Sequence, residues 1–295
     1  MTGPAVSVPE VRGRKRRLGQ EALVMVTAYD YPMARIVDAA GVDMILVGDS
    51  VANVVLGYED TLQVTVDDMV HHVSAVARAR PRALVVGDMP WMSYHLGPED
   101  AVRNAARLVR AGAGAVKLEG GPVRAPVIEA IVAAEIPVMG HLGLTPQSVH
   151  VMGGYRVQAR TKEAAQALAE AARAVVVAGC FAVVIEGVPD VVGAAVTEGV
   201  DVPTIGIGAG PHCDGQVLVG PDLLGLSFGR TPKFVRRYAE LGTEATSAVA
   251  AFAADVRAGR FPTEAESYHG NAALQETAAR HATVAVPDPA ADGET

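Results

Sequence analysis

Four short apolar runs in this chain end at an acidic residue, and this pattern restricts the folds that the chain can adopt. The acidic residues are Asp49, Asp88, Glu119 and Glu186. Short apolar runs separated by helical patterns are typical of buried parallel strands. In a (β/α)8 barrel the C-terminal ends of all strands meet at one mouth, where the chemistry of this fold takes place. We therefore predict an α/β protein with a single-domain (β/α)8 TIM barrel.

Carboxylates gathered at such a mouth need a partner of opposite charge. Two carboxylates about 4 Å apart repel each other by roughly 4 kcal/mol at an effective dielectric near 20. Three or four of them together require a cation, a proton or a cationic substrate. The pattern therefore predicts a metal-dependent enzyme.

Composition excludes several other classes of protein. The chain has 295 residues, half of them hydrophobic, and a formal net charge of −8, which argues against nucleic acid as a partner. No apolar run approaches the ~20 residues that span a bilayer, so we expect no membrane partner. No signal-peptide pattern opens the sequence, and Cys180 and Cys213 are too few for a disulfide framework. We expect a cytoplasmic protein.

The chain is expected to have three parts: an N-terminal lead-in at 1–20, the catalytic barrel at 21–262, and a C-terminal extension at 263–295, disordered in its last part. Besides the four acidic-ended runs, strands are expected at 22–29, 137–141, 202–207 and 216–219. Thr65 opens one helix, with Asp67 and Asp68 in its first turn. Other helices are expected at 32–40, 99–110, 123–134, 162–178, 190–198 and 232–258. The tail from about residue 271 lacks a sustained apolar face, so we expect it to be disordered.

The lead-in carries the one basic run of the sequence, for which we expect a solvated role. This run consists of Arg12, Arg14, Lys15, Arg16 and Arg17.

An open doubly wound sheet is the competing architecture. Such a sheet binds its ligand near two strands at one switch point, whereas acidic ends occur here on four strands. The barrel fits this distribution better.

Asp49, Asp88 and Glu119 are the predicted metal ligands. Hard oxygen ligands of this kind suit Mg²⁺, which keeps several waters and is rarely enclosed by protein alone. The alternative is that each carboxylate caps a helix or pairs with an arginine.

Lys117 and Glu186 are the other charged candidates. Lys117 faces the same side of its strand as Glu119, so it could hold a substrate carboxylate, stabilise an enolate or form a Schiff base; a structural ion pair is the alternative. Glu186 could remove a proton next to a carbonyl group or act as a further metal ligand. Ser50 offers a hydroxyl beside Asp49. His141 has a supporting role in the site or only packs.

Several segments together resemble one known family. They are Thr-Ala-Tyr-Asp-Tyr at 27–31, Val-Gly-Asp-Ser at 47–50, Val-Lys-Leu-Glu-Gly-Gly at 116–121, Gly-His-Leu-Gly-Leu-Thr-Pro-Gln-Ser at 140–148 and Ile-Gly-Ile-Gly-Ala-Gly at 205–210. In this order they resemble the ketopantoate hydroxymethyltransferase family, over about residues 8 to 262. The glycine run at 206–210 by itself is typical of a barrel phosphate loop or of a tight turn. Ala159 stands where the family usually has glycine.

The resemblance implies a (β/α)8 enzyme that transfers a one-carbon unit from 5,10-methylenetetrahydrofolate to 3-methyl-2-oxobutanoate (2-oxoisovalerate) on the route to pantothenate and coenzyme A. It implies Mg²⁺ bound by Asp49, Asp88 and Glu119, ketoacid contacts from Ser50, Asp49, Asp88 and Lys117, and Glu186 as the proton acceptor. It also implies a homodecamer.

Three other functions fit the residues less well. The first is a Mg²⁺-dependent carbon–carbon lyase or aldolase of the phosphoenolpyruvate mutase and isocitrate lyase type, acting on another 2-oxoacid. The second is a Schiff-base aldolase that uses Lys117. The third is a binding protein in which the carboxylates do no chemistry.

Overall fold

The computed structural model of this chain describes residues 4–15, 21–229 and 231–282. Its contacts divide the chain into two compact units, of which the first ends at Leu241 and the second begins at Gly242. The predicted end of the barrel, residue 262, lies 21 residues later. The two units are described separately below.

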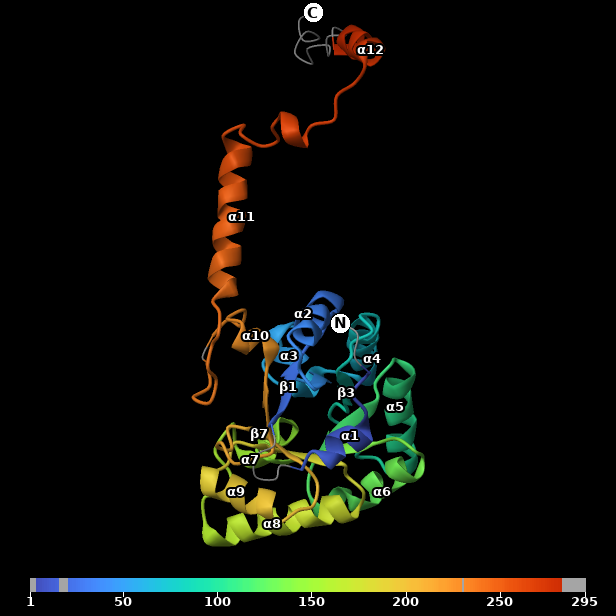
Figure 1. Cartoon of the computed structure of the whole chain (residues 1–295), viewed down its shortest axis with the longest axis vertical. Coiled ribbons are helices and arrows are strands. Elements are labelled where there is room, and N and C mark those ends of the chain that lie inside the picture. Colours follow the sequence, from blue (N-terminus) through green and yellow to red (C-terminus); the bar gives the residue numbers. More distant parts are fainter. Residues whose placement is uncertain (1–3, 16–20, 230, 283–295) are drawn as a thin grey trace, which may run out of the picture. The chain divides into compact units, whose positions relative to one another are not determined.

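The first unit is a closed barrel of parallel strands (Figure 1). Each strand pairs in parallel with the next, and the last pairs with the first, for example through Met25 and Val217. The strands of the described residues are β1 (Leu23–Thr27), β2 (Met44–Val47), β3 (Leu84–Asp88), β4 (Ala115–Glu119), β5 (Val138–Gly143), β6 (Ala182–Glu186), β7 (Thr204–Ile207) and β8 (Gly215–Leu218). The predicted fold class is confirmed.

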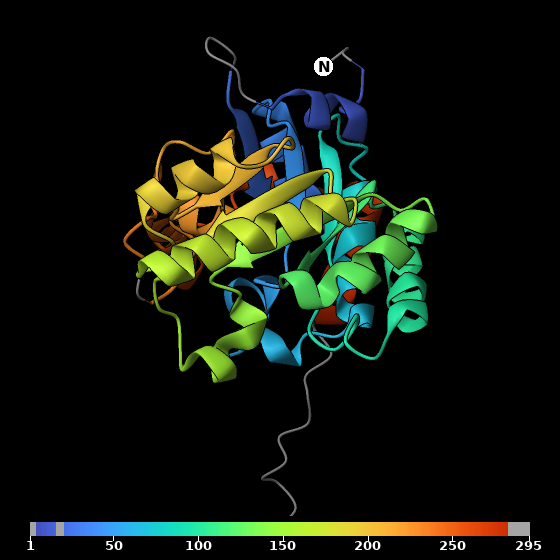
Figure 2. The same ribbon diagram turned by 90° about the horizontal axis from the view of Figure 1, so that it is seen from below.

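Helices connect the strands and cover the outside of the barrel, where the long α8 is prominent in Figure 2. The α-helices of the first unit are α1 (Val8–Gly13), α2 (Tyr31–Ala39), α3 (Val51–Val54), α4 (Val66–Ala77), α5 (Pro98–Arg110), α6 (Ala125–Ala133), α7 (Val149–Met152), α8 (Lys162–Val177), α9 (Asp190–Glu198) and α10 (Gly220–Leu223). Short 3₁₀ turns are η1 (Thr61–Gln63), η2 (Pro122–Arg124) and η3 (Pro146–Ser148). Thr65 and Asp68 form the capping box that opens α4.

Strand periodicity sorts the apolar side chains into two cores. Residues that alternate along a strand point to opposite faces of the sheet. One set, which includes Ile45, Val85 and Val116, packs against the surrounding helices. The other set, which includes Met44 and Val86, fills the barrel interior. The interior is therefore a packed core below the mouth, as in other barrels of this type.

The described part of the lead-in packs against the barrel. Helix α1 is capped by Ser7, and Val6 and Val11 pack with the residues of the barrel interior. Arg14 forms an ion pair with Asp43. The expectation of a solvated role is therefore wrong for Arg14, whereas Arg12 is exposed as expected. Arg16 and Arg17 lie outside the described residues.

Helix α11 (Leu241–Arg257) dominates the second unit, which also contains η4 (Glu264–Glu266) and α12 (Ala272–Ala282). The helix predicted at 232–258 begins only at residue 241, because residues 233–234 form a turn and Phe234 packs against Gly208 of the barrel. Residues 272–282 form a helix where we expected disorder, and the last part of the predicted disordered tail lies outside the described residues. Among the residues that the structure describes, no helix is both long enough and apolar enough to cross a bilayer.

Candidate active site

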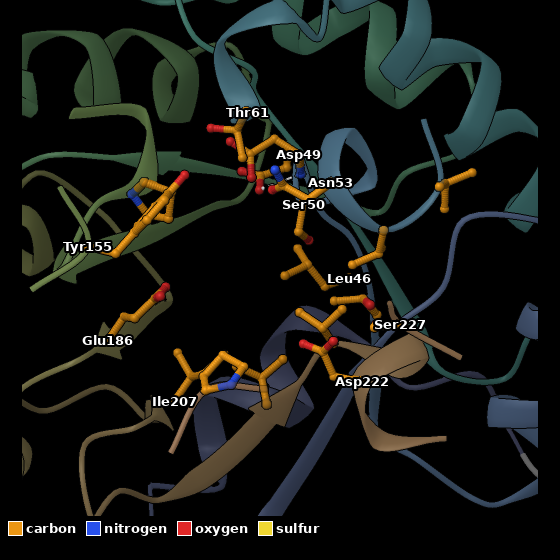
Figure 3. Close-up of a pocket in the computed structure, with 18 of the residues that line it drawn as sticks. Leu46, Asp49, Ser50, Asn53, Thr61, Tyr155, Glu186, Ile207, Asp222 and Ser227 are labelled. Atoms are coloured by element: carbon orange, nitrogen blue, oxygen red, sulfur yellow. Dashed lines mark hydrogen bonds between the residues drawn. The ribbon is translucent and has the colours of Figure 1, made fainter. Parts of the chain in front are cut away.

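A pocket of about 760 Å³ opens at the C-terminal ends of the strands of the first unit. All of the residues that the sequence predicted for the site line this one pocket, and several of them are visible in Figure 3. They are Asp49, Ser50, Asp88, Lys117, Glu119 and Glu186. The structure therefore brings the predicted residues together at the barrel mouth.

Strand alternation explains why these side chains reach the pocket. Val86, Ala115 and Val184 belong to the interior core. The residues two positions later are Asp88, Lys117 and Glu186, which all line the pocket above that core. The same spacing carries His141, two positions after Met139, into the pocket. A polar layer thus covers the apolar interior.

Asp88 and Lys117 form a buried ion pair at neighbouring positions of β3 and β4. Lys117 Nζ lies 2.8 Å from Asp88 Oδ1, and Asp49 N donates a hydrogen bond of 3.1 Å to Asp88 Oδ2. Lys117 is the one partner of Asp88 Oδ1 among the described residues. Burial, with help from Asp49 and Glu119 and against the effect of Lys117, raises the pKa of Asp88 to about 8.

Lys117 is held in its charged form by its surroundings. Burial acts to lower its pKa, but the charges of Asp88, Glu119 and Asp49 outweigh burial and raise the pKa above its ordinary value. The side chain is almost completely enclosed, with 3% of its surface exposed. One fixed positive charge therefore faces three carboxylates.

His141 connects the metal-ligand candidates to Glu186. Its Nδ1 lies 3.2 Å from Glu119 Oε1 and its Nε2 lies 3.1 Å from Glu186 Oε2. Lys117 Nζ is 3.2 Å from the same Nδ1. Burial and Lys117 act to lower the pKa of His141, but Glu119 and Glu186 outweigh them and raise it to about 9. His141 therefore does more than pack. None of the other histidines lines the pocket among the described residues.

Gln147 holds two of the predicted metal ligands, and the sequence analysis missed it. Its Nε2 donates to Asp49 Oδ2 over 2.9 Å, and its backbone N donates to Glu119 Oε2 over 3.0 Å. Tyr94 OH donates to Gln147 Oε1 and accepts from the backbone N of Glu119. Gln147 and Tyr94 are both buried. Gln147 could have been found from its place in the segment 140–148 at the end of a strand, because a glutamine at a barrel mouth can bridge carboxylates.

Ser50 and the glycine run have modest structural roles. Ser50 Oγ lies 2.8 Å from Tyr29 OH, within hydrogen-bond distance. In the run 206–210, Gly208 has a φ of 61°, and a Cβ at this position would lie 2.8 Å from the ring of Phe234. The run therefore supports a tight turn beneath an aromatic ring.

The site lacks a ready-made metal cage. Among the described residues, no three His, Cys, Asp or Glu side chains are placed to hold a metal ion by themselves. Mg²⁺ does not need such a cage, because it is commonly bound by one or two carboxylates with waters and substrate oxygens. Asp88 Oδ1 and Glu119 Oε1 are buried in the site and face only Lys117 and His141 among the described residues. Carboxylate oxygens with so few donors fit a hard divalent cation.

Solved structures with similar folds belong to other enzymes of the barrel class. A phosphonomutase described as putative, from Burkholderia cenocepacia J2315, matches with a TM-score of 0.60 at 18% identity, over 84% of this chain and 99% of that one. A 2,3-dimethylmalate lyase of the phosphoenolpyruvate mutase/isocitrate lyase superfamily matches with a TM-score of 0.57 at 18% identity, over 94% of this chain and 99% of that one. At these identities the likeness concerns the fold alone.

Sequence comparison identifies the family. Residues 6–264 match the ketopantoate hydroxymethyltransferase family. The 3-methyl-2-oxobutanoate hydroxymethyltransferase of Syntrophomonas wolfei is 55% identical over 88% of this chain and 94% of its own. The enzyme of the same name from Methylobacterium sp. is 59% identical over 83% of this chain and 85% of its own. The prediction of a transferase of this kind is confirmed, and the chain belongs to the ketopantoate hydroxymethyltransferase family.

Proposed function

We propose that this enzyme transfers a hydroxymethyl group from 5,10-methylenetetrahydrofolate to 3-methyl-2-oxobutanoate, with Mg²⁺ as cofactor. The observation that supports this most strongly is the cluster of four carboxylates around Lys117 and His141 in one pocket. Such a site suits a small anionic ketoacid only if a cation offsets the carboxylates. A water molecule supplies the hydroxyl oxygen, and the products are 2-dehydropantoate and tetrahydrofolate. This places the reaction on the route to pantothenate and coenzyme A.

Asp49, Asp88 and Glu119 would hold the Mg²⁺. When bound, the ion would supply positive charge that polarises the ketoacid and so makes its C3 proton more acidic. Gln147 fixes the carboxylates of Asp49 and Glu119 through two hydrogen bonds. This chain therefore orients its ligands before the substrate arrives, which lowers the reorganisation that binding would otherwise require.

Lys117 stabilises negative charge in this mechanism. A protonated amine has no lone pair with which to attack a carbonyl carbon, and Asp88 and Glu119 favour the protonated form of Lys117. Schiff-base lysines need the opposite environment, one that lowers their pKa. The surroundings of Lys117 thus favour electrostatic stabilisation of an enolate over aldolase chemistry.

Glu186 accepts the C3 proton of the ketoacid. It ends β6 at the same mouth and, with 15% of its side chain exposed, is more accessible than Asp49, Asp88 and Glu119. His141 contacts its carboxylate and keeps it in place. Water releases the methylene carbon from the two folate nitrogens as formaldehyde, which leaves tetrahydrofolate. C3, having lost its proton, attacks the formaldehyde carbon, and the resulting alkoxide takes up a proton to become the hydroxymethyl group. The homodecamer and the cytoplasmic location remain predictions.

Three measurements test this function. Consumption of 2-oxoisovalerate should require methylenetetrahydrofolate and should stop when a chelator removes divalent ions. In deuterated water, without folate, the enzyme should exchange the C3 proton of 2-oxoisovalerate. The Glu186→Gln variant should lose about 10² to 10⁴ of this exchange rate while it still binds Mg²⁺ and ketoacid.

Two results would contradict the proposal. Exchange at the parent rate in Glu186→Gln would place the base elsewhere. Borohydride treatment with 2-oxoisovalerate should leave the protein mass unchanged, and an adduct on Lys117 would instead establish a Schiff-base mechanism.

A further inference from the structure

The carboxylates of Asp49, Asp88, Glu119 and Glu186 form what we call the floor of the pocket. A second polar wall, opposite this floor, is left unused by the ketoacid reaction. This wall comes from α10 and the chain that follows it, and it presents Asp222 and Ser227 to the pocket (Figure 3). In the figure Asp222 lies across the cavity from Glu186 and Tyr155. A volume of about 760 Å³ falls in the range of pockets that take drug-sized ligands, and 2-oxoisovalerate fills only a small part of it.

Both polar groups of this wall lack partners. The Asp222 carboxylate makes no hydrogen bond or ion pair with any described residue, and the side chain is only half-buried. Ser227 Oγ is buried and likewise has no hydrogen-bond partner in the described part of the chain. Polar groups enclosed in a pocket are normally satisfied. A ligand with hydrogen-bond donors would satisfy both of them.

Aromatic rings flank these polar groups. Phe234 lines the pocket and lies over Gly208, where the absence of a side chain makes room for its ring. Phe228 also lines the pocket, and 95% of its surface is exposed. An aromatic ring left in water beside a cavity is suited to stack on a planar ligand. The wall therefore combines a carboxylate, a hydroxyl and aromatic surface.

We propose that this wall binds the pterin ring of the folate and that Asp222 accepts hydrogen bonds from its N3–H and 2-amino groups. These two donors lie side by side and match the two oxygens of a carboxylate, as a guanidinium does. The transferable carbon sits at the other end of the pterin, between N5 and N10. Holding the N3 edge at Asp222 therefore directs that carbon across the pocket toward Glu186. The inference rests on the function proposed above.

The test compares tetrahydrofolate binding by the Mg²⁺-loaded, full-length parent and by Asp222→Asn, measured by calorimetric titration. Because a hydrogen-bonded charge is lost, affinity should fall about 10- to 100-fold. Ser227→Ala should weaken binding in the same direction by a smaller factor. Asp201→Asn, the same change at an exposed residue outside the pocket, should bind as the parent does.

A tetrahydrofolate analogue with methyl in place of the 2-amino group sharpens the test. It should bind the parent about as weakly as tetrahydrofolate binds Asp222→Asn, and the variant should no longer distinguish the two ligands. Two controls should give the same result in Asp222→Asn and in the parent. Folate-independent exchange of the ketoacid C3 proton reports on the floor of the pocket, and the thermal unfolding midpoint reports on folding.

Equal tetrahydrofolate affinity in the parent and Asp222→Asn would overturn the inference, as would a variant that still prefers the 2-amino ligand. Loss of C3 exchange in Asp222→Asn would also overturn it, by assigning Asp222 to the floor. A parent that exchanges the C3 proton but binds no tetrahydrofolate would refute the pterin wall and leave the ketoacid half of the proposed function standing. A parent with neither property would refute both.

Discussion

The two ends of the barrel each bury a carboxylate, but they treat it differently. At the N-terminal end, Asp214 Oδ2 accepts from Lys15 Nζ over 2.8 Å, from Thr204 N over 2.8 Å and from Thr204 Oγ1 over 3.1 Å. At the mouth, Asp88 accepts one backbone hydrogen bond, from Asp49 N, and pairs with Lys117 over 2.8 Å, but the charge of this lysine is shared with Glu119 and Asp49. Both side chains are 1% exposed.

This difference shows where the fold gains stability and where it retains binding capacity. A buried carboxylate with several donors is compensated within the protein, so its charge serves the folded state. A carboxylate that shares one lysine with two other carboxylates has capacity left for a cation or substrate that comes from solution. The N-terminal end of a barrel is generally the stabilising end and the C-terminal end the catalytic one. Asp214 and Asp88 follow that division.

The largest effect is expected from Asp88→Asn, which should lower kcat/KM on the order of 10³-fold, as loss of a preorganised electrostatic group does. Stability should change little, because asparagine can still accept the hydrogen bond from Asp49 N and Lys117 keeps Glu119 as a neighbouring charge. Steady-state turnover and urea unfolding measure the two quantities. Activity within tenfold of the parent would remove Asp88 from the catalytic machinery.

Asp214→Asn should show the opposite behaviour. The change leaves Lys15 without its charged partner and should cost about 3 kcal/mol of unfolding free energy, the lower end for a broken buried pair. Activity per folded molecule should stay at the parent level, since Asp214 lies outside the pocket. Unfolding in urea and an active-site titration test this. A stable but inactive variant would contradict the division between the two ends.

Gln147→Leu tests how the mouth keeps its carboxylates in place. The variant loses the hydrogen bond to Asp49 and leaves Tyr94 OH without its acceptor. Affinity for Mn²⁺, a spectroscopic substitute for Mg²⁺, should fall about 10- to 100-fold by electron paramagnetic resonance, as is typical for residues that orient ligands. Gln166→Leu on the exposed face of α8 provides the matched control. Unchanged Mn²⁺ affinity would mean that Gln147 only fills space.

The smallest effect is expected at Ala159, near Gly187 in the mouth loops. Ala159 has a φ of 53°, in the left-handed region that costs a residue with a Cβ about 1–2 kcal/mol. Glycine removes this strain but has more entropy to lose on folding, so Ala159→Gly should raise the unfolding free energy by about 0.5 kcal/mol. Thermal unfolding checks the sign. A clear loss of stability would show that packing of the methyl group outweighs the strain.

Much of the site was predictable because each residue obeys a local rule. Asp88, Glu119 and Glu186 end apolar strands, and parallel strands of a barrel bring their ends together whatever the helices outside do. Thr65 and Asp68 opened α4 as predicted, since a capping box is a contact between residues three apart. Gln147, Tyr94 and Asp222 escaped prediction because they come from loops and a short helix, where no periodicity indicates direction.

The sequence by itself determined the barrel, the family and the acidic mouth, because strand period, strand ends and ordered motifs are properties of nearby residues. Only the tertiary structure decided which charges are compensated. Lys15 and Asp214 are 199 positions apart and Gln147 and Asp49 are 98 apart, and no local pattern couples residues at such separations. Whether a buried carboxylate stabilises the fold or waits for a ligand depends on donors that closure of the barrel brings to it.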